Sequence, residues 1–417
     1  MQRRTSRWLA AGVLAAAGAL TLSACGSGFS SGTSTATPGA LTSSKKPLTV
    51  LIGSSGDAET KAVTSAVADW SKTSGTKATV SAASDLGQQL AQGFAAGKPA
   101  DVFYLSTDAL AGYASNGSLL AYGDMLPNKS DFYPSLVTSF TYNKKFYCAP
   151  KDFSTLALEI NTDMWTAAGL TDADIPKTWD QLATVAKKLT TSAHVGLGIG
   201  GEYARIAAFM TEAGGNLMNA DSTKATANSA ANVQALDYVK KLMADGSLKF
   251  AKDLGAGWGG EAFGKGLAAM TIEGNWITGA MTTDYTNIKY KVVELPAGPA
   301  GKGTMQFTNC WGIAADSPNQ AAALKLVEKL TTAGDQLAFS KAFGPMPSIK
   351  SAASQWKKEN PFLVPFLNGA AYAQGVPTAK GASNVVTDFN SKVSSLATAD
   401  PKTILDATQA NLEALVK

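Results

Sequence analysis

Apolar residues recur along the chain in two patterns. Short apolar runs are typical of buried strands, and segments in which apolar residues return every three or four positions are typical of helices. Residues 47–53 (PLTVLIG) form such a run, and residues 59–73 follow with Val63, Val67 and Trp70 on one helical face. This pair predicts a strand that leads directly into a helix.

The same alternation continues through the chain. Further strands are expected at 78–80, 101–105, 195–199, 268–272 and 290–294, and further helices at 86–96, 203–213, 230–244, 321–330 and after residue 351. Strands that alternate with helices imply a parallel sheet covered on both faces. The sequence therefore predicts an α/β fold.

The first 24 residues have a different pattern, which is typical of an export signal. Three arginines precede the apolar run Trp8–Leu22, and small residues lead to Cys25. The stretch resembles a bacterial lipoprotein signal, in which the cysteine thiol receives a diacylglyceryl group before cleavage makes it the new N-terminus. A plain secretory signal or an uncleaved anchor are the alternatives, although the run is shorter than the ~20 residues that span a bilayer. We expect residues 1–24 to be removed and Cys25 to hold the protein on the outer face of the cytoplasmic membrane.

A linker is expected after the lipidated cysteine. Residues 26–44 are almost entirely Gly, Ser, Thr, Ala and Pro, a composition that cannot bury enough apolar surface to fold. We therefore assign residues 25–45 to a flexible linker, with folded protein beginning near Lys46.

Composition and charge narrow the class of protein. About 370 residues with 45% hydrophobic content can build two domains. Removal of the three signal arginines reduces the 36 basic residues to 33, against 32 acidic ones. The mature chain is therefore almost neutral, and it has no basic stretch interleaved with aromatics, so we expect no nucleic-acid partner.

Two cysteines remain besides Cys25. Cys148 and Cys310 form an even pair in an exported chain, which favours a disulfide, with two free buried thiols as the alternative. No C-x-x-C spacing occurs, so we expect no zinc site.

Signals for catalysis are weak. His194 is the single histidine, no G-x-S-x-G motif occurs, and residues 53–57 lack the ending of a phosphate-binding loop. A carboxylate pair for glycoside hydrolysis could be formed only in three dimensions, and no segment singles one out. These observations favour a binding protein that is not an enzyme and has no cofactor.

Six segments after Lys46 carry recognisable motifs in a fixed order. They are residues 99–120 (PADVFY through GSLL), 146–150 (FYCAP), 156–163 (LALEINTD), 175–182 (IPKTWDQL), 263–276 (FGKGLAAM through GNW) and 311–317 (WGIAADS). Together they resemble the extracellular solute-binding proteins of ABC importers. The subfamily resembled is the maltose-binding-protein type, which mostly carries sugars.

This resemblance implies a type II periplasmic-binding-protein fold, with two lobes joined by crossing strands and a ligand cleft between them. The implied lobes are 46–150 plus 312–347 for lobe I, and 151–311 plus 348–417 for lobe II. In the family, the first two crossings lie side by side, which would bring Cys148 and Cys310 within bridging distance.

The resemblance also implies the ligand and the partners. We expect a monomer that captures a sugar or oligosaccharide by lobe closure and delivers it to the permease subunits of an ABC transporter. Polyols, glycerol phosphates, polyamines and metal complexes are alternative solutes. A membrane-tethered glycoside hydrolase and a structural or chaperone lipoprotein are alternatives from other classes.

Five ligand-binding residues are suggested by position within the family pattern. Asp108 is the polar candidate of lobe I, with a helix N-cap as its alternative role. Trp276 matches the stacking tryptophan of the family, with core packing as the alternative. Glu202 and Tyr203 follow a strand-to-helix turn at which the family often presents an acid and an aromatic. Asp152 lies on the crossing strand, where a structural salt bridge is the alternative.

Three further candidates lie in loops. Trp258 is flanked by glycines that could present its ring at the cleft edge, with an exposed loop plug as the alternative. Ser54 and Ser55 follow the first strand, where α/β sheets bind ligands. The chain departs from maltose-binding relatives at Leu105 and Ala109, which replace an aromatic and an arginine. This departure makes maltose itself a doubtful ligand.

Overall fold

The computed structural model describes residues 40–417. The predicted signal peptide, most of the predicted linker and the lipidation site Cys25 lie outside the described residues. None of the helices within the described part is both long and apolar enough to cross a membrane.

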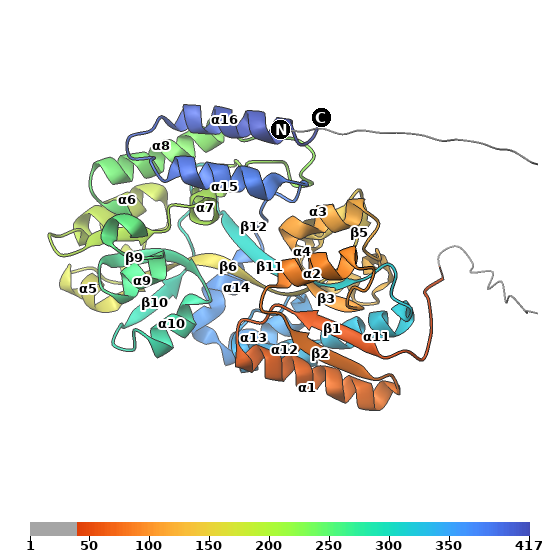
Figure 1. Cartoon of the computed structure of the whole chain (residues 1–417). Helices are drawn as coiled ribbons and strands as arrows, with labels where there is room; N and C mark the ends of the chain where they lie inside the picture. The colour runs from red at the N-terminus through yellow and green to blue at the C-terminus, as the bar shows by residue number, and fades with distance from the viewer. Residues whose placement is uncertain (1–39) are drawn as a thin grey trace, which may run out of the picture. The chain divides into compact units, whose positions relative to one another are not determined.

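The described chain is built on one large mixed sheet (Figure 1). Its strands are β1 (Leu48–Ile52), β2 (Ala78–Ala82), β3 (Val102–Ser106), β6 (Ala149–Asn161), β7 (Val195–Ile199), β8 (Leu248–Phe250), β9 (Ala268–Gly274), β10 (Tyr290–Val293), β11 (Thr304–Ile313) and β12 (Ala373–Gln374). They lie in the order β2-β1-β3-β11-β6-β9-β7-β8, with β10 beside β6 and β12 beside β11. A separate hairpin pairs β4 (Thr141–Tyr142) with β5 (Lys145–Phe146).

Helices cover both parts of the sheet. They are α1 (Asp57–Ser74), α2 (Leu86–Ala95), α3 (Thr107–Ser115), α4 (Pro134–Ser139), α5 (Thr162–Ala167), α6 (Trp179–Leu189), α7 (Tyr203–Glu212), α8 (Ala230–Ala244), α9 (Gly259–Gly264), α10 (Ile277–Thr283), α11 (Gln320–Leu330), α12 (Ala333–Phe343), α13 (Ala353–Glu359), α14 (Val364–Gly369), α15 (Ala382–Val393) and α16 (Pro401–Glu413). The predicted α/β class is confirmed, and α8 has the predicted bounds. The prediction of a parallel sheet is wrong, because at the centre of the sheet β11 runs antiparallel to β3 and β6, and β6 runs antiparallel to β9.

Local sequence signals explain several of these boundaries. Thr178 caps α6 by accepting a hydrogen bond from the backbone N–H of Gln181, and Asn161 caps α5 in the same way. At the other end of a helix, Gly75 ends α1 with a positive φ of 71°, a conformation that costs glycine little.

Two strands connect two separate cores. The N-terminal half of β6 pairs with β11, and its C-terminal half pairs with β9, so β6 passes from one half of the sheet to the other. One hydrophobic cluster surrounds β1, β3 and α11, and a second surrounds β7, β9 and α8. We call these the first and second lobes and call β6 and β11 the hinge strands. This is the two-lobed arrangement that the family resemblance implied.

The lobes differ from the predicted boundaries at two places. Ile349 and Ala352 pack in the core of the first lobe, so the chain leaves that lobe later than residue 347. The packed chain also begins before Lys46. Leu41 contacts the first lobe, and the Thr42 hydroxyl donates to the carbonyl of Ser317 at 2.7 Å. Side-chain packing sets both the start of the folded chain and the end of the first lobe, and the composition of these segments does not reveal that packing.

Cys148 and Cys310 form a disulfide, with their Cα atoms 5.7 Å apart. Cys310 pairs across the hinge strands with Pro150, two residues after Cys148. The expected bond is therefore present, and it joins the hinge strands on the first-lobe side.

Candidate ligand-binding cleft

The hinge strands present two faces with different chemistry. Side chains alternate along a strand, so Phe307 and Asn309 of β11 share one face. Asp152 of β6 lies opposite Asn309 in the register and therefore on the same face. We call this the front face. Gln306 and Thr308 point to the other side, which we call the back face.

Trp276 stands at the front face, on the second lobe. It follows the end of β9 and precedes α10, and its residue is 40% exposed. Its ring packs edge-on against Phe307 with centroids 5.5 Å apart, and its indole N–H donates to Glu273 Oε2 at 3.0 Å. The ring is therefore exposed but fixed in orientation.

Arg205 holds the other side of this tryptophan. Its guanidinium lies 5.4 Å from the Trp276 ring centroid, and it forms ion pairs with Glu202 at 2.8 Å and with Glu273. Sequence reasoning selected Glu202 but missed Arg205. An arginine one helical turn after an acidic residue that begins a helix could have signalled this pair.

Tyr203 lies elsewhere, although it is adjacent to Glu202. It is only 1% exposed, packs against Phe389 in the second core, and donates its hydroxyl to Asn216. Its side chain supports the lobe rather than the cleft surface, because the helix that begins at Tyr203 turns this residue inward.

Two buried carboxylates lie beneath Trp276. Glu159 and Glu273 are both fully buried, and the backbone N–H of Glu273 donates to Glu159 Oε2 at 3.1 Å. Burial and then the nearby Glu273 raise the pKa of Glu159 well above its usual value. Burial also raises the pKa of Glu273, while Arg205 opposes the rise. Within the described protein, one oxygen of each carboxylate has no hydrogen-bond partner.

The first lobe places a different charge cluster beside the hinge. Lys151 of β6 is 8% exposed and forms ion pairs with Asp152 and with Glu59 at 3.1 Å. Burial opposes the Lys151 charge, but these two carboxylates raise its pKa. Burial raises the pKa of Asp152 despite the neighbouring lysine. Asp152 thus forms the salt bridge that the sequence left open as its alternative role.

The serine and aspartate candidates occupy the edge of the first lobe. Ser54 and Ser55 form the turn between β1 and α1, and the Ser55 backbone N–H donates to Glu59 at 2.7 Å. Asp108 is exposed in the first turn of α3, and Ser106 occupies the N-cap position. Ser106 pairs with Asn309 of the hinge, so α3 begins beside the front face.

Trp258 occupies a more enclosed position. It is half-buried at the N-terminus of α9 and packs against the cluster that contains Phe263. Gly260 is needed beside it, because a Cβ atom there would lie 2.1 Å from the indole ring. The ring therefore packs against the first turn of α9.

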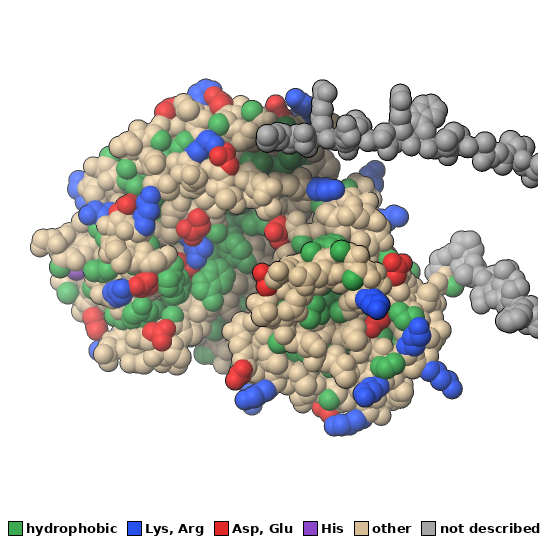
Figure 2. Space-filling view, in the orientation of Figure 1, with side chains coloured by type: hydrophobic (Ala, Val, Ile, Leu, Met, Phe, Trp, Pro, Cys, Tyr) green, Lys and Arg blue, Asp and Glu red, His purple; other side chains and the backbone are tan. Residues whose placement is uncertain are grey.

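Figure 2 shows a hollow between the two lobes, with hydrophobic side chains on its wall and acidic and basic side chains beside them. A fixed, exposed aromatic ring, neighbouring charged groups and a hinge between two lobes together define a protein that binds a solute between its lobes.

Comparison with known proteins agrees with this class. Residues 54–337 match the family model described as bacterial extracellular solute-binding protein, and the chain belongs to this family. A binding protein of Brucella abortus (strain 2308) is 23% identical over 348 residues, which cover 79% of this chain and 83% of that protein.

Solved structures share the fold. The cyclic alpha-maltosyl-1,6-maltose binding protein from Arthrobacter globiformis is 21% identical with a TM-score of 0.79, covering 89% of this chain and 99% of its own. A cyclo/maltodextrin-binding protein complexed with maltotetraose is 21% identical with a TM-score of 0.75, covering 89% and 98%. UgpB from Mycobacterium tuberculosis, in complex with glycerophosphocholine, is 17% identical with a TM-score of 0.73, covering 89% and 98%.

Proposed function

We propose that this protein binds a sugar or oligosaccharide at the front face of the hinge strands and delivers it to the permease of an ABC transporter. Acylation of Cys25 would hold the monomer at the outer face of the cytoplasmic membrane. The observation that carries the sugar proposal is Trp276, a residue that is 40% exposed although Phe307, Arg205 and Glu273 hold its ring in place.

A pyranose ring suits such a surface. Its C–H face can cover an aromatic ring, while its hydroxyls need directional partners to replace water. Glu202 and Arg205 lie beside the ring, and Asn309 lies on the floor. Because the Trp276 ring is already fixed, little side-chain entropy is lost when a ligand stacks on it.

The charges beside the cleft favour a neutral ligand. Arg205 and Lys151 are each paired with two carboxylates. A phosphate-bearing solute would have to compete with these acids for the same cations. The fold also accommodates such solutes, as the complex with glycerophosphocholine shows for UgpB, so glycerol phosphates remain the second candidate class to be tested.

Ligand binding is expected to close the lobes. Trp276 stands on the second lobe, whereas Asp108, Ser54 and Ser55 lie at the edge of the first. A sugar can contact both sets of residues together only when the lobes approach, so it stabilises the closed state.

A thermal-shift panel of maltodextrins, disaccharides, polyols and glycerol phosphates tests this proposal. A true ligand at a hundredfold excess over Kd adds about 2.7 kcal/mol to the free energy of unfolding. Trp276→Ala should then weaken sugar binding about tenfold or more by calorimetry, and Asp108→Ala comparably, without loss of folding.

Phe362→Ala is the matched control, because this ring is 43% exposed but packs against Tyr290 away from the front face. It should leave affinity unchanged. The proposal fails if no sugar stabilises the protein, or if Trp276→Ala binds as tightly as the parent.

The lipid anchor has its own test. Cys25→Ser should accumulate as unprocessed precursor and should lose labelling by radioactive palmitate. Mature protein whose first residue is not Cys25 would contradict the anchor without affecting the sugar proposal.

A further inference from the structure

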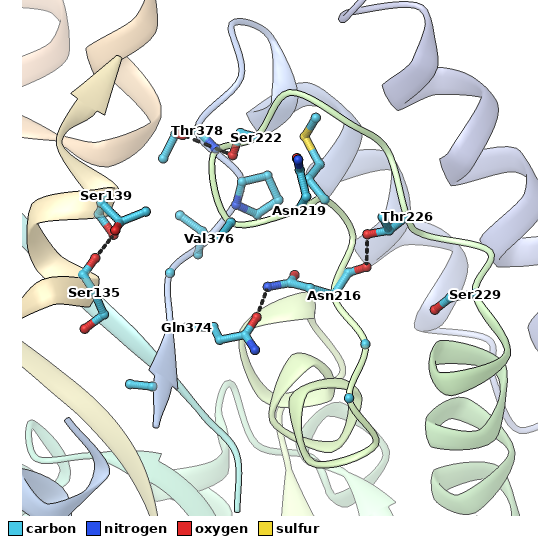
Figure 3. Close-up of a pocket in the computed structure, with 18 residues that line it drawn as sticks. Ser135, Ser139, Asn216, Asn219, Ser222, Thr226, Ser229, Gln374, Val376 and Thr378 are labelled. Carbon is cyan, nitrogen blue, oxygen red and sulfur yellow. Dashed lines mark hydrogen bonds between the residues drawn. The ribbon is translucent and has the colours of Figure 1, made fainter. Parts of the chain in front are cut away.

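A second cavity lies between the lobes, with a volume of about 580 Å³ (Figure 3). Helix α4 of the first lobe forms one wall, and the segment 214–229 between α7 and α8 forms the other. Residues 373–378, which include β12, form the remaining side.

This cavity lies on the back face of the hinge. The Ser135 hydroxyl donates to Gln306 Oε1 at 2.8 Å, and Gln306 Nε2 donates to the Ser139 hydroxyl at 3.2 Å. Gln306 points away from Phe307, the next residue of β11, and Phe307 is the residue that contacts Trp276. The cavity and the Trp276 surface are therefore on opposite sides of the hinge strands.

The lining of the cavity is uncharged and combines hydroxyl and amide groups with apolar surface. Among the described residues, none of those that line it is Asp, Glu, Lys, Arg or His. Hydroxyl and amide groups come from both lobes, and Met218, Val376 and Pro377 add an apolar patch. Such a lining lacks the charges that dominate the front face.

The walls of the cavity are held in place by their own hydrogen bonds. Asn216 Nδ2 donates to Gln374 Oε1 at 2.8 Å, as Figure 3 shows. Ser222 adopts a positive φ of 54°, and its hydroxyl accepts a hydrogen bond from the backbone N–H of Thr378 at 3.0 Å. A non-glycine residue keeps such a conformation only when its surroundings fix it. The two walls that the second lobe contributes are thus preformed, and α4 completes the cavity from the first lobe.

We propose that this cavity is a second binding site, for a small neutral polyhydroxylated molecule such as a sugar or polyol. Its volume is within the range of about 300–1,000 Å³ found for small-molecule pockets. Hydroxyl and amide groups can exchange hydrogen bonds with ligand hydroxyls, and the uncharged lining gives no compensation for an ionic ligand.

Occupancy of this site opposes closure of the front cleft. Rotation about the hinge strands that brings the front walls together must separate the back walls. A ligand that contacts α4 and the 214–229 segment together is lost when they separate, so it binds the open state more tightly. This coupling rests on the proposed function, and it is reciprocal.

The site itself can be tested in the Trp276→Ala variant, in which the front surface is weakened. Glucose, trehalose, sorbitol and myo-inositol are titrated at up to tens of millimolar, and the methyl signal of Met218 is followed by NMR. At least one probe should shift the Met218 methyl signal, and the shift should reach a plateau as the probe concentration rises. No shift with any of the four probes would overturn the proposal.

Two further variants locate the binding. Val376→Trp should fill the cavity and abolish the Met218 shift. Thr138→Ala, which removes a wall hydroxyl, should weaken probe binding several-fold. Thr184→Ala is its matched control, because both threonines are exposed on helices and donate to the carbonyl four residues earlier. If both Thr138→Ala and Val376→Trp bind the probe as tightly as the parent does, the assignment of the site to this cavity is overturned.

The coupling is measured separately, in protein with an intact Trp276. A probe that shifts Met218 should weaken front-site binding severalfold, and Val376→Trp should remove this effect. If a probe shifts the Met218 signal but no tested sugar binds at the front face, the proposed function is contradicted and the second site still stands. Independence of the two sites would overturn the coupling.

Discussion

The two lobes each bring a cationic side chain and buried acids to the hinge, but they satisfy the acids differently. In the first lobe, Glu59 accepts hydrogen bonds from four donors, which belong to Lys151, Tyr104 and Ser55. In the second lobe, Glu159 accepts one hydrogen bond from the backbone of Glu273, and its other oxygen has no partner in the described protein.

This difference in pairing shifts the pKa values of the two glutamates in opposite directions. Burial raises the pKa of Glu59, but Lys151 and the Ser55 donors outweigh it, so the pKa falls below its usual value. Burial raises the pKa of Glu159 and Glu273 adds to the rise, while Arg205 is engaged by other acids. Donors around a buried acid, rather than burial alone, therefore determine whether the acid is charged.

The largest expected effect follows from removing the cation of the first lobe. Lys151→Met keeps the length of the side chain but leaves Glu59 and Asp152 without their common partner. Breaking a buried pair in this way costs about 3–5 kcal/mol, and we expect urea denaturation at pH 7 to show a loss of this order.

The triple variant Lys151→Met, Glu59→Gln, Asp152→Asn is the control, because it removes the uncompensated charges together. It should recover a large part of the loss. If Lys151→Met alone is as stable as the parent, Lys151 contributes nothing to the stability of the cluster.

The fold was largely predictable, because its signals are local. The apolar runs at β1 and β7 and the capped, amphipathic α6 are visible within windows of a dozen residues. The site was only partly predictable. Trp276 and Glu202 lie at strand ends that the motifs identify. Arg205 could not be found in this way, because its partner Glu273 lies 68 residues further along the chain.

The back cavity was not predictable from the sequence. Its walls come from three segments that span residues 135 to 378, and their residues are ordinary Ser, Thr, Asn and Gln. The burial of Tyr203 was missed for a related reason. Tyr203 packs inward against Phe389, which lies far along the chain, and a local pattern does not report that contact.

A smaller loss is expected from removing the cation of the second lobe. Arg205→Met leaves Glu273 with the indole N–H of Trp276 as its remaining side-chain partner. Glu273 can respond by taking up a proton, and Arg205 is 13% exposed at the cleft, so we expect a loss of about 1.5–3 kcal/mol.

The Arg205→Met variant should also change the emission of Trp276, since the guanidinium lies over its ring. Arg205→Lys is the control that retains a charge. If Arg205→Met destabilises the protein as much as Lys151→Met does, the two clusters do not differ in the way that their pairing indicates.

The sharpest comparison is between Glu59→Gln and Glu159→Gln, which should have stability effects of opposite sign. The lowered pKa of Glu59 stabilises the fold above the unfolded pKa of about 4.3, and this contribution is lost as the pH falls. Glu59→Gln should therefore be less stable than the parent at pH 7, and the deficit should shrink toward pH 4.

The raised pKa of Glu159 has the reverse effect, because the folded state retains a proton that the unfolded state releases. Each unit of that rise costs about 1.4 kcal/mol above the folded pKa, so Glu159→Gln should gain stability relative to the parent as the pH rises from 4.5 to 8. Urea titrations of both variants from about pH 3 to pH 8 measure the two slopes, because the Glu59 contribution changes around and below the unfolded pKa of about 4.3 and the Glu159 contribution changes above it. Slopes of the same sign would show that the donors around each acid do not control its pKa.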